Sequence, residues 1–138
     1  SKIRKALFAL PLCLSGLAYA EVAVIVNPSA GVDAASKEEI ARLFLGKTTN
    51  IKGVALTAVD QAEGNATRNA FYQKVADKTA SQLNAYWSRL IFTGKGQPPE
   101  PVADDSEVLQ SVSEDAGTIG YVDASAVNGT VKVIFTAP

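Results

Sequence analysis

A nine-residue turn carries the side chains best suited to holding a ligand. It reads Asp60-Gln61-Ala62-Glu63-Gly64-Asn65-Ala66-Thr67-Arg68. It joins the end of an expected strand to the start of an expected helix, where α/β folds usually place their ligands. The free amides of the helix's first turn, the Thr67 hydroxyl and the Arg68 guanidinium can together hold an oxyanion. The turn is therefore a candidate anion-binding site.

A purely structural interpretation of the same turn is equally physical. In that interpretation Asn65 only caps the helix, Thr67 only satisfies an amide, and Arg68 only pairs with Glu63 at the surface. The local residues by themselves favour this structural interpretation over an oxyanion site.

The rest of the sequence offers no catalytic constellation. It contains no histidine, and its one cysteine is Cys13, so the commonest general base and the commonest metal ligand are both missing. The acidic pairs Asp104-Asp105 and Glu114-Asp115 lie at expected helix ends, where they complement the helix dipole or face water. Neither pair has the alternating oxygen ligands of a calcium loop. We therefore expect a binding protein and not an enzyme, with no metal and no cofactor.

The first twenty residues have the three-part pattern of a secretory signal peptide. Cations at positions 2, 4 and 5 precede an apolar run over residues 6–14, and Ala18-Tyr19-Ala20 supplies small residues for signal peptidase. The apolar run is too short to span a bilayer, and the alternative of a buried helix must accommodate Pro11 in its interior. We expect cleavage after Ala20, no lipid on Cys13 and a periplasmic location.

Residues 21–138 are enough for one hydrophobic core and form the single expected domain. Removal of the three leader cations from a chain of net charge −1 leaves a net charge of −4. Nucleic-acid binding requires a basic patch, which this balance does not provide. We therefore expect no nucleic-acid partner.

Apolar periodicity and capping residues predict an α/β fold with a mixed β-sheet and helices on its faces. Capping boxes at Ser36 and Thr79 begin two helices, Asn65 begins a third, and Asp105 or Ser106 begins a fourth. Asn128-Gly129 has the dipeptide of a type I′ turn, and the proline-rich residues 94–101 indicate an irregular surface loop. The expected strands cover residues 21–27, 54–59, 118–122 and 131–135.

Trp87 lies on the apolar side of the helix that Thr79 begins. Leu83, Tyr86, Leu90 and Ile91 follow the same helical spacing. We interpret Trp87 as a packing residue and not as a platform for a ligand.

Three segments resemble the phosphate-type periplasmic substrate-binding proteins, which supply phosphate to ABC transporters. The segments are residues 40–47 (IARLFLGK), residues 57–59 (TAV) with 64–71 (GNATRNAF), and residues 117–122 (GTIGYV). Their order and spacing match the family over nearly all of residues 21–138. In the family these segments belong mainly to the second lobe of a two-lobe fold, so the resemblance implies one periplasmic-binding-protein-like lobe.

The resemblance also implies a ligand set. Glu63 and Thr67 match the family turn, Arg68 matches a position that is often arginine, and Asn65 and Ala66 replace a serine and a glycine. Gln61 stands where the family usually has an arginine, so one charged donor is lost. The predicted ligand-binding residues are Gln61, Glu63, Gly64, Asn65, Ala66, Thr67 and Arg68.

Two hypotheses follow from the altered turn. The first is a binding protein that holds phosphate or a related oxyanion weakly for ABC-type uptake, with a permease or a second lobe-like protein as partner. The second is an interaction or self-assembling module derived from a binding-protein lobe.

Overall fold

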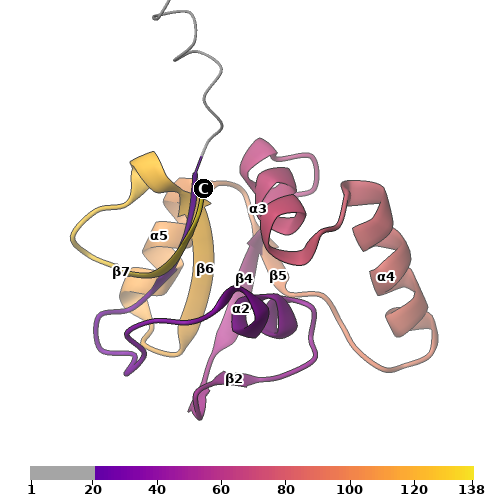
Figure 1. The fold of residues 1–138 in the computed structure, drawn as a ribbon, viewed down its shortest axis with the longest axis horizontal. Coiled ribbons are helices and arrows are strands. Elements are labelled where there is room, and N and C mark those ends of the chain that lie inside the picture. Colours follow the sequence, from indigo (N-terminus) through magenta and orange to yellow (C-terminus); the bar gives the residue numbers. More distant parts are fainter. Residues whose placement is uncertain (1–20) are drawn as a thin grey trace, which may run out of the picture.

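The structure, a computed structural model, describes residues 21–138, so the expected signal peptide lies outside the described residues. Figure 1 shows the arrangement of the elements. The strands are β1 (Val22–Val26), β2 (Asn50–Ile51), β3 (Val54–Ala55), β4 (Thr57–Gln61), β5 (Glu100–Val102), β6 (Thr118–Asp123) and β7 (Lys132–Ala137). The helices are α2 (Lys37–Phe44), α3 (Ala66–Ala76), α4 (Ala80–Phe92), α5 (Asp105–Glu114) and the short 3₁₀ helix η1 (Ala124–Ala126).

The main sheet has the strand order β5-β4-β6-β1-β7. β4 runs parallel to β5 and β6, whereas β1 runs antiparallel to β6 and β7. All five residues of β1 are buried, as expected for a β-branched run that is covered on both faces. The predicted mixed sheet with helices on its faces is confirmed.

Alternate residues of β1 point to two hydrophobic clusters on opposite faces of the sheet. Val22, Val24 and Val26 join a large cluster that contains side chains of α2, α3 and α4. Ala23 and Ile25 join a smaller cluster with side chains of α5 and β6. The sheet therefore separates α2, α3 and α4 on one face from α5 and η1 on the other.

The helix amino ends form largely as the sequence predicts. Ser36 and Thr79 each complete a capping box, and Asn65 is the N-cap of α3. The prediction for α5 is wrong by one position, because the Asp104 side chain caps it by accepting a hydrogen bond from the Glu107 amide at 3.1 Å. Asp104 and Asp105 have similar capping propensities, so local sequence does not distinguish them.

Two short strands, β2 and β5, escape sequence analysis, and the expected strand over residues 54–59 is divided between β3 and β4. β2 and β3 form a hairpin whose turn, Lys52-Gly53, has positive φ at both residues. β5 lies inside the segment expected to be an irregular loop and pairs with β4. Pairing of such short strands depends on their neighbours in space more than on their own residues.

The type I′ prediction for Asn128-Gly129 is wrong. Neither residue has a positive φ, which that turn requires at both central positions. The Asn128 side chain instead accepts a hydrogen bond from the Thr130 amide at 2.9 Å. The segment leads from β6 to β7, and β1 lies between those two strands in the sheet.

The predicted apolar side of α4 is only partly correct. Leu83 and Trp87 are buried, as predicted, but Ile91 is 53% exposed. Phe92, at the end of the helix, is 91% exposed. In Figure 1, α4 stands at one edge of the molecule, and its carboxyl end projects beyond the sheet.

Gly120 in β6 lets α5 pack closely against the sheet, which leads to a testable prediction. A Cβ at this position would lie 2.5 Å from Val108 Cγ1 and 3.0 Å from Val59 Cγ1. Gly120→Ala is therefore expected to lower the free energy of unfolding by about 1–3 kcal/mol through overpacking, measured by chemical denaturation. Gly129→Ala is the control, because its Cβ would meet nothing within 4 Å. Equal stability of the two variants would contradict this account.

Candidate functional site

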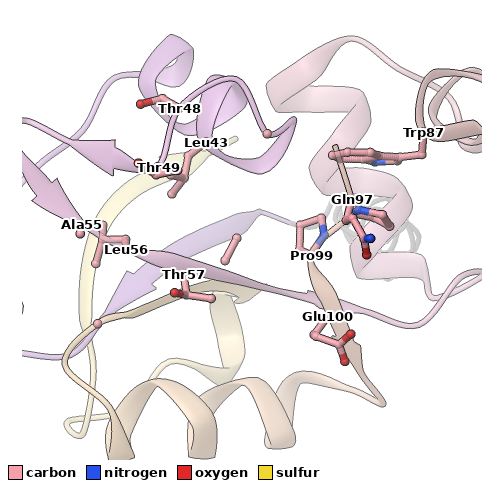
Figure 2. A pocket seen from close by; sticks show the side chains of 14 residues that line it. Leu43, Thr48, Thr49, Ala55, Leu56, Thr57, Trp87, Gln97, Pro99 and Glu100 are labelled. Atoms are coloured by element: carbon pink, nitrogen blue, oxygen red, sulfur yellow. The ribbon is translucent and has the colours of Figure 1, made fainter. Parts of the chain in front are cut away.

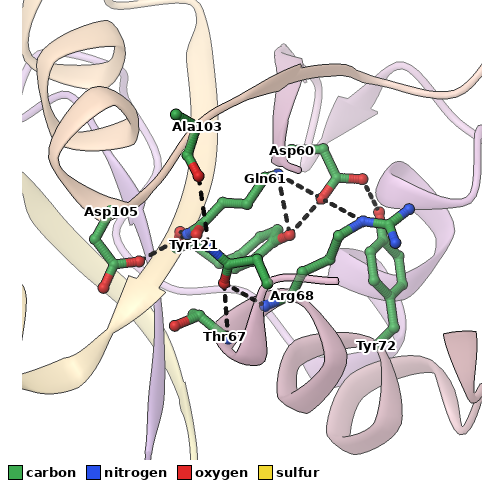
Figure 3. Close-up of polar contacts among 9 residues, drawn as sticks. Asp60, Gln61, Thr67, Arg68, Tyr72, Ala103, Asp105 and Tyr121 are labelled. Carbon is green, nitrogen blue, oxygen red and sulfur yellow. Dashed lines mark hydrogen bonds and ion pairs between the residues drawn. The ribbon is translucent and has the colours of Figure 1, made fainter. Parts of the chain in front are cut away.

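The candidate site lies where β4 and β5 end and where α3 and α5 begin. β4 and β5 are parallel, and Gln61 faces Val102 in their register. Their carboxyl ends therefore lead to neighbouring helix amino ends. The Asn65 side chain connects the two, because its Nδ2 donates to the Ala103 carbonyl at 3.5 Å. Figure 3 shows the polar contacts around this edge.

Asn65 occupies two of the amides at the amino end of α3. Its Oδ1 accepts hydrogen bonds from the Thr67 amide at 2.8 Å and from the Arg68 amide at 3.3 Å. The capping role predicted for Asn65 is confirmed. An incoming oxyanion would compete with this side chain for the same two donors.

The exposed part of the turn leaves one hydroxyl available. Thr67 is half-buried, and its hydroxyl makes no hydrogen bond within the part of the chain that the structure describes. Gly64 and Ala66 are exposed. Glu63 accepts a hydrogen bond from Asn84 Nδ2 at 2.8 Å, which connects the turn to α4.

Gln61 is a buried cross-link between three elements. Its side-chain Nε2 donates to Asp105 Oδ1 at 2.8 Å and to the Tyr121 carbonyl at 2.9 Å. The residue is 1% exposed, and its Oε1 has no partner within the described residues. Gln61 thus connects β4 to α5 and β6. It also places a neutral amide at the position where the family that this chain resembles usually has an arginine.

Arg68 does not pair with Glu63, so that part of the structural interpretation is wrong. Its Nε lies 3.6 Å from Asp60 Oδ1, and its Cζ lies 5.4 Å from the centroid of the Tyr72 ring. Only 9% of the residue is exposed. Figure 3 shows the guanidinium directed toward Asp60 and Tyr72, while the Gln61 amide is directed toward Asp105. The structure therefore does not bring the guanidinium together with the amide of Gln61.

Asp60 is the centre of a buried polar network that sequence analysis missed. Its Oδ2 accepts a hydrogen bond from the Tyr72 hydroxyl at 2.7 Å. Its Oδ1 accepts hydrogen bonds from the backbone amide of Gln61 at 2.8 Å and from the Tyr121 hydroxyl. Asp60 is 3% exposed. Its position directly after an apolar strand, with an arginine eight residues later, is the one local signal of a buried ion pair.

Both tyrosines of this network stay protonated at neutral pH. Burial is the main cause that raises the pKa of Tyr72 and of Tyr121, and the neighbouring Asp60 carboxylate raises both pKa values further. The two hydroxyls therefore act as fixed hydrogen-bond donors to Asp60. Asp60 and Arg68 compensate one another's charge, so the turn offers an anion mainly neutral donors.

Neither a metal centre nor a membrane span emerges from the part of the chain that the structure describes. Residues 21–138 contain no group of three or more His, Cys, Asp or Glu side chains placed to hold a metal ion. None of the helices in this range is long and apolar enough to cross a membrane.

The strand order and the helix amino ends at one edge define an α/β lobe of the periplasmic-binding-protein kind. No family model matches the chain. Among curated proteins, it is similar to the phosphate-binding protein PstS of Bacillus subtilis, with 27% identity over 113 residues. That alignment covers 77% of this chain and 32% of the relative.

Solved structures with the same fold bear related names. One is a putative phosphate ABC transporter substrate-binding protein with bound phosphate from Clostridium perfringens, with a TM-score of 0.61 and 21% identity. Another is an ABC-type phosphate transport receptor from Vibrio cholerae, with a TM-score of 0.64 and 17% identity. Each match covers 83% of this chain, and 45% and 46% of the respective structures.

These likenesses confirm the fold class and the resemblance to a single lobe of phosphate-type substrate-binding proteins. The chain spans about a third of the curated relative's length and less than half of each solved structure.

Proposed function

We propose that residues 21–138 form a periplasmic substrate-binding domain that binds phosphate or a related oxyanion weakly in ABC-type uptake. The observation that carries the proposal is the position of residues 61–68. This turn resembles the anion-binding turn of phosphate-type binding proteins, and it lies between the end of β4 and the start of α3 in a lobe of the same fold. The domain acts by binding and not as an enzyme.

Three features explain why binding by this lobe is weak. Asn65 competes for the Thr67 and Arg68 amides, Asp60 compensates the charge of Arg68, and Gln61 is neutral. A charge-assisted hydrogen bond contributes about 1.5–3 kcal/mol, whereas an exposed helix end contributes about 0.3–1 kcal/mol to anion binding. Without the charged donor at position 61, the free energy of binding depends mainly on the Thr67 hydroxyl and on displacement of Asn65.

A partner that covers the turn would strengthen binding, because it would exclude water and add donors from the opposite side. A second lobe-like protein or a transporter permease fits this role, since the anion is otherwise open to solvent on that side.

Removal of the Asn65 side chain tests the site directly. Asn65→Ala frees two amides, so phosphate is expected to bind more tightly than to wild type, while the free energy of unfolding falls by about 1 kcal/mol through loss of the cap. Phosphate should then raise the denaturation midpoint of the variant more than that of wild type. Calorimetry with phosphate and with sulfate, alongside denaturation, measures both effects.

Two further variants complete this experiment. Thr67→Ala in the Asn65→Ala background is expected to weaken the phosphate heat. Asn128→Ala is the matched control, because the Asn128 side chain also accepts a hydrogen bond from a nearby backbone amide but lies on a different turn. The proposal of an anion site is wrong if Asn65→Ala shows no heat of binding at millimolar phosphate.

The interaction-module hypothesis remains the second candidate. Two observations favour it: the Asn65 side chain already occupies the amino end of α3, and Phe92 is exposed. It expects no phosphate heat in wild type or in Asn65→Ala, and a complex that surface substitutions disrupt.

A further inference from the structure

A groove runs across the start of β4, away from the candidate anion site. One cavity of about 570 Å³ opens between α2, α4 and the segment that leads into β5, as Figure 2 shows. An adjoining cavity of about 430 Å³ shares Thr57, Ala58 and Glu100 with it. We call these two adjoining cavities, one on the α2 side of β4 and the other on its α5 side, the groove.

The two ends of this groove differ in character. The first cavity has apolar walls, and Glu100 is the only charged residue among its described lining residues. The second cavity adds Glu114 and Asp115, and no lysine or arginine of the described residues lines either cavity. The residues that form the apolar end are Leu43, Leu56, Trp87, Pro98 and Pro99. The groove therefore fits an apolar group that has positive charge beside it.

The carboxyl end of α4 presents such a group. Phe92 is 91% exposed and Ile91 is 53% exposed. Arg89 and Lys95, on either side of them in the sequence, are exposed as well. A large apolar side chain that is almost fully exposed between two cations is typical of an interaction surface.

This group and the groove lie near one another on the molecule. Residues 93–96 lead from Phe92 directly to Gln97, which lines the groove. Trp87, on the same helix as Phe92, lines the groove as well. A surface that contains both a projecting group and its complementary groove can pair with itself about a two-fold axis, because each copy then gives and receives the same contact.

We propose that two copies of this chain associate through these surfaces. Phe92 of each copy enters the apolar end of the other copy's groove beside Trp87. Arg89 and Lys95 then face Glu100, which lines both cavities. This association stands independently of the proposed anion binding, since none of these residues belongs to residues 61–68.

Association is tested by analytical ultracentrifugation of the purified protein from micromolar to millimolar concentration. Trp87, the only tryptophan in the sequence, should change its fluorescence over the same concentration range as the mass changes. Phe92→Ser is expected to raise the dimer dissociation constant at least about tenfold and to leave the denaturation midpoint at low concentration unchanged. Val133→Ser is the control, because Val133 is 37% exposed on β7 and outside the groove, and it should leave association unchanged.

A charge exchange tests the orientation of the two copies. Glu100→Lys is expected to weaken association, and adding Lys95→Glu to the same chain should restore it, since opposite charges face one another again. A wild-type protein that stays monomeric at millimolar concentration overturns the proposal. Dimerisation that Phe92→Ser does not weaken, or a double variant that is no stronger than Glu100→Lys, overturns it equally. Capture of a basic, apolar peptide by a monomeric protein would reassign the groove to another partner.

Discussion

Asp60→Ala is expected to lower the free energy of unfolding by about 3–5 kcal/mol, because it leaves the Arg68 charge buried without a partner. Asp60 is 3% exposed and Arg68 is 9% exposed, so water does not replace the lost carboxylate. The hydroxyls of Tyr72 and Tyr121 also lose their acceptor. An unsatisfied buried donor adds about 1–3 kcal/mol to the cost where the cavity admits no water.

Chemical denaturation measures this effect, and two variants make it specific. Asp33→Ala removes a carboxylate that pairs with Lys132 but has an 89% exposed side chain, so a much smaller loss of stability is expected, because water and salt screen an exposed ion pair. Asp60→Asn keeps an acceptor for the tyrosines and should lie between Asp60→Ala and wild type. If Asp60→Ala were as stable as Asp33→Ala, the buried charge of Arg68 would not depend on Asp60 for its stabilisation.

Trp87→Ala is the second substitution with a large expected effect. Trp87 is 5% exposed and belongs to the main hydrophobic cluster, and its ring lies 5.1 Å from that of Tyr86. Truncation of a buried aromatic side chain to alanine lowers the free energy of unfolding by about 3–5 kcal/mol. Since the free energy of unfolding of a whole domain is only about 5–15 kcal/mol, the variant should unfold at a much lower denaturant concentration.

The matched control for Trp87 is on the same helix. Phe92→Ala removes a ring that is 91% exposed, so its free energy of unfolding, measured at a concentration too low for association, should stay within about 0.5 kcal/mol of wild type. If the two variants behaved alike, Trp87 would not be part of the core, and α4 would contribute little to the stability of the domain.

Sequence patterns predicted the features whose causes lie within a few residues. The capping boxes at Ser36 and Thr79 and the N-cap Asn65 form as expected, because a capping side chain bonds to amides two or three positions away. The apolar runs also predicted β1 and the buried Trp87. These interactions are encoded by spacing along the chain, so the sequence determined them by itself.

The candidate site was predicted only in outline. The sequence located the candidate turn at residues 60–68, between a strand and a helix; in the structure β4 extends to Gln61 and α3 begins at Ala66. It did not predict that Gln61 would bond to Asp105, 44 residues away, or that Arg68 would pair with Asp60. Asp60 was part of the candidate turn, but its place at the centre of a buried network was not predicted, because two of its partners, Tyr72 and Tyr121, come from different elements.

Tertiary structure alone decided which residues meet across the sheet. β5 exists because it pairs with β4, and Asn128 lies outside a hairpin turn because β1 separates β6 from β7. Ile91 has the periodicity of a core residue but is exposed, because no element covers that end of α4 within the described residues. The physical reason is common to these cases: a side chain's partner depends on packing between distant elements, and local periodicity reports only the face it occupies.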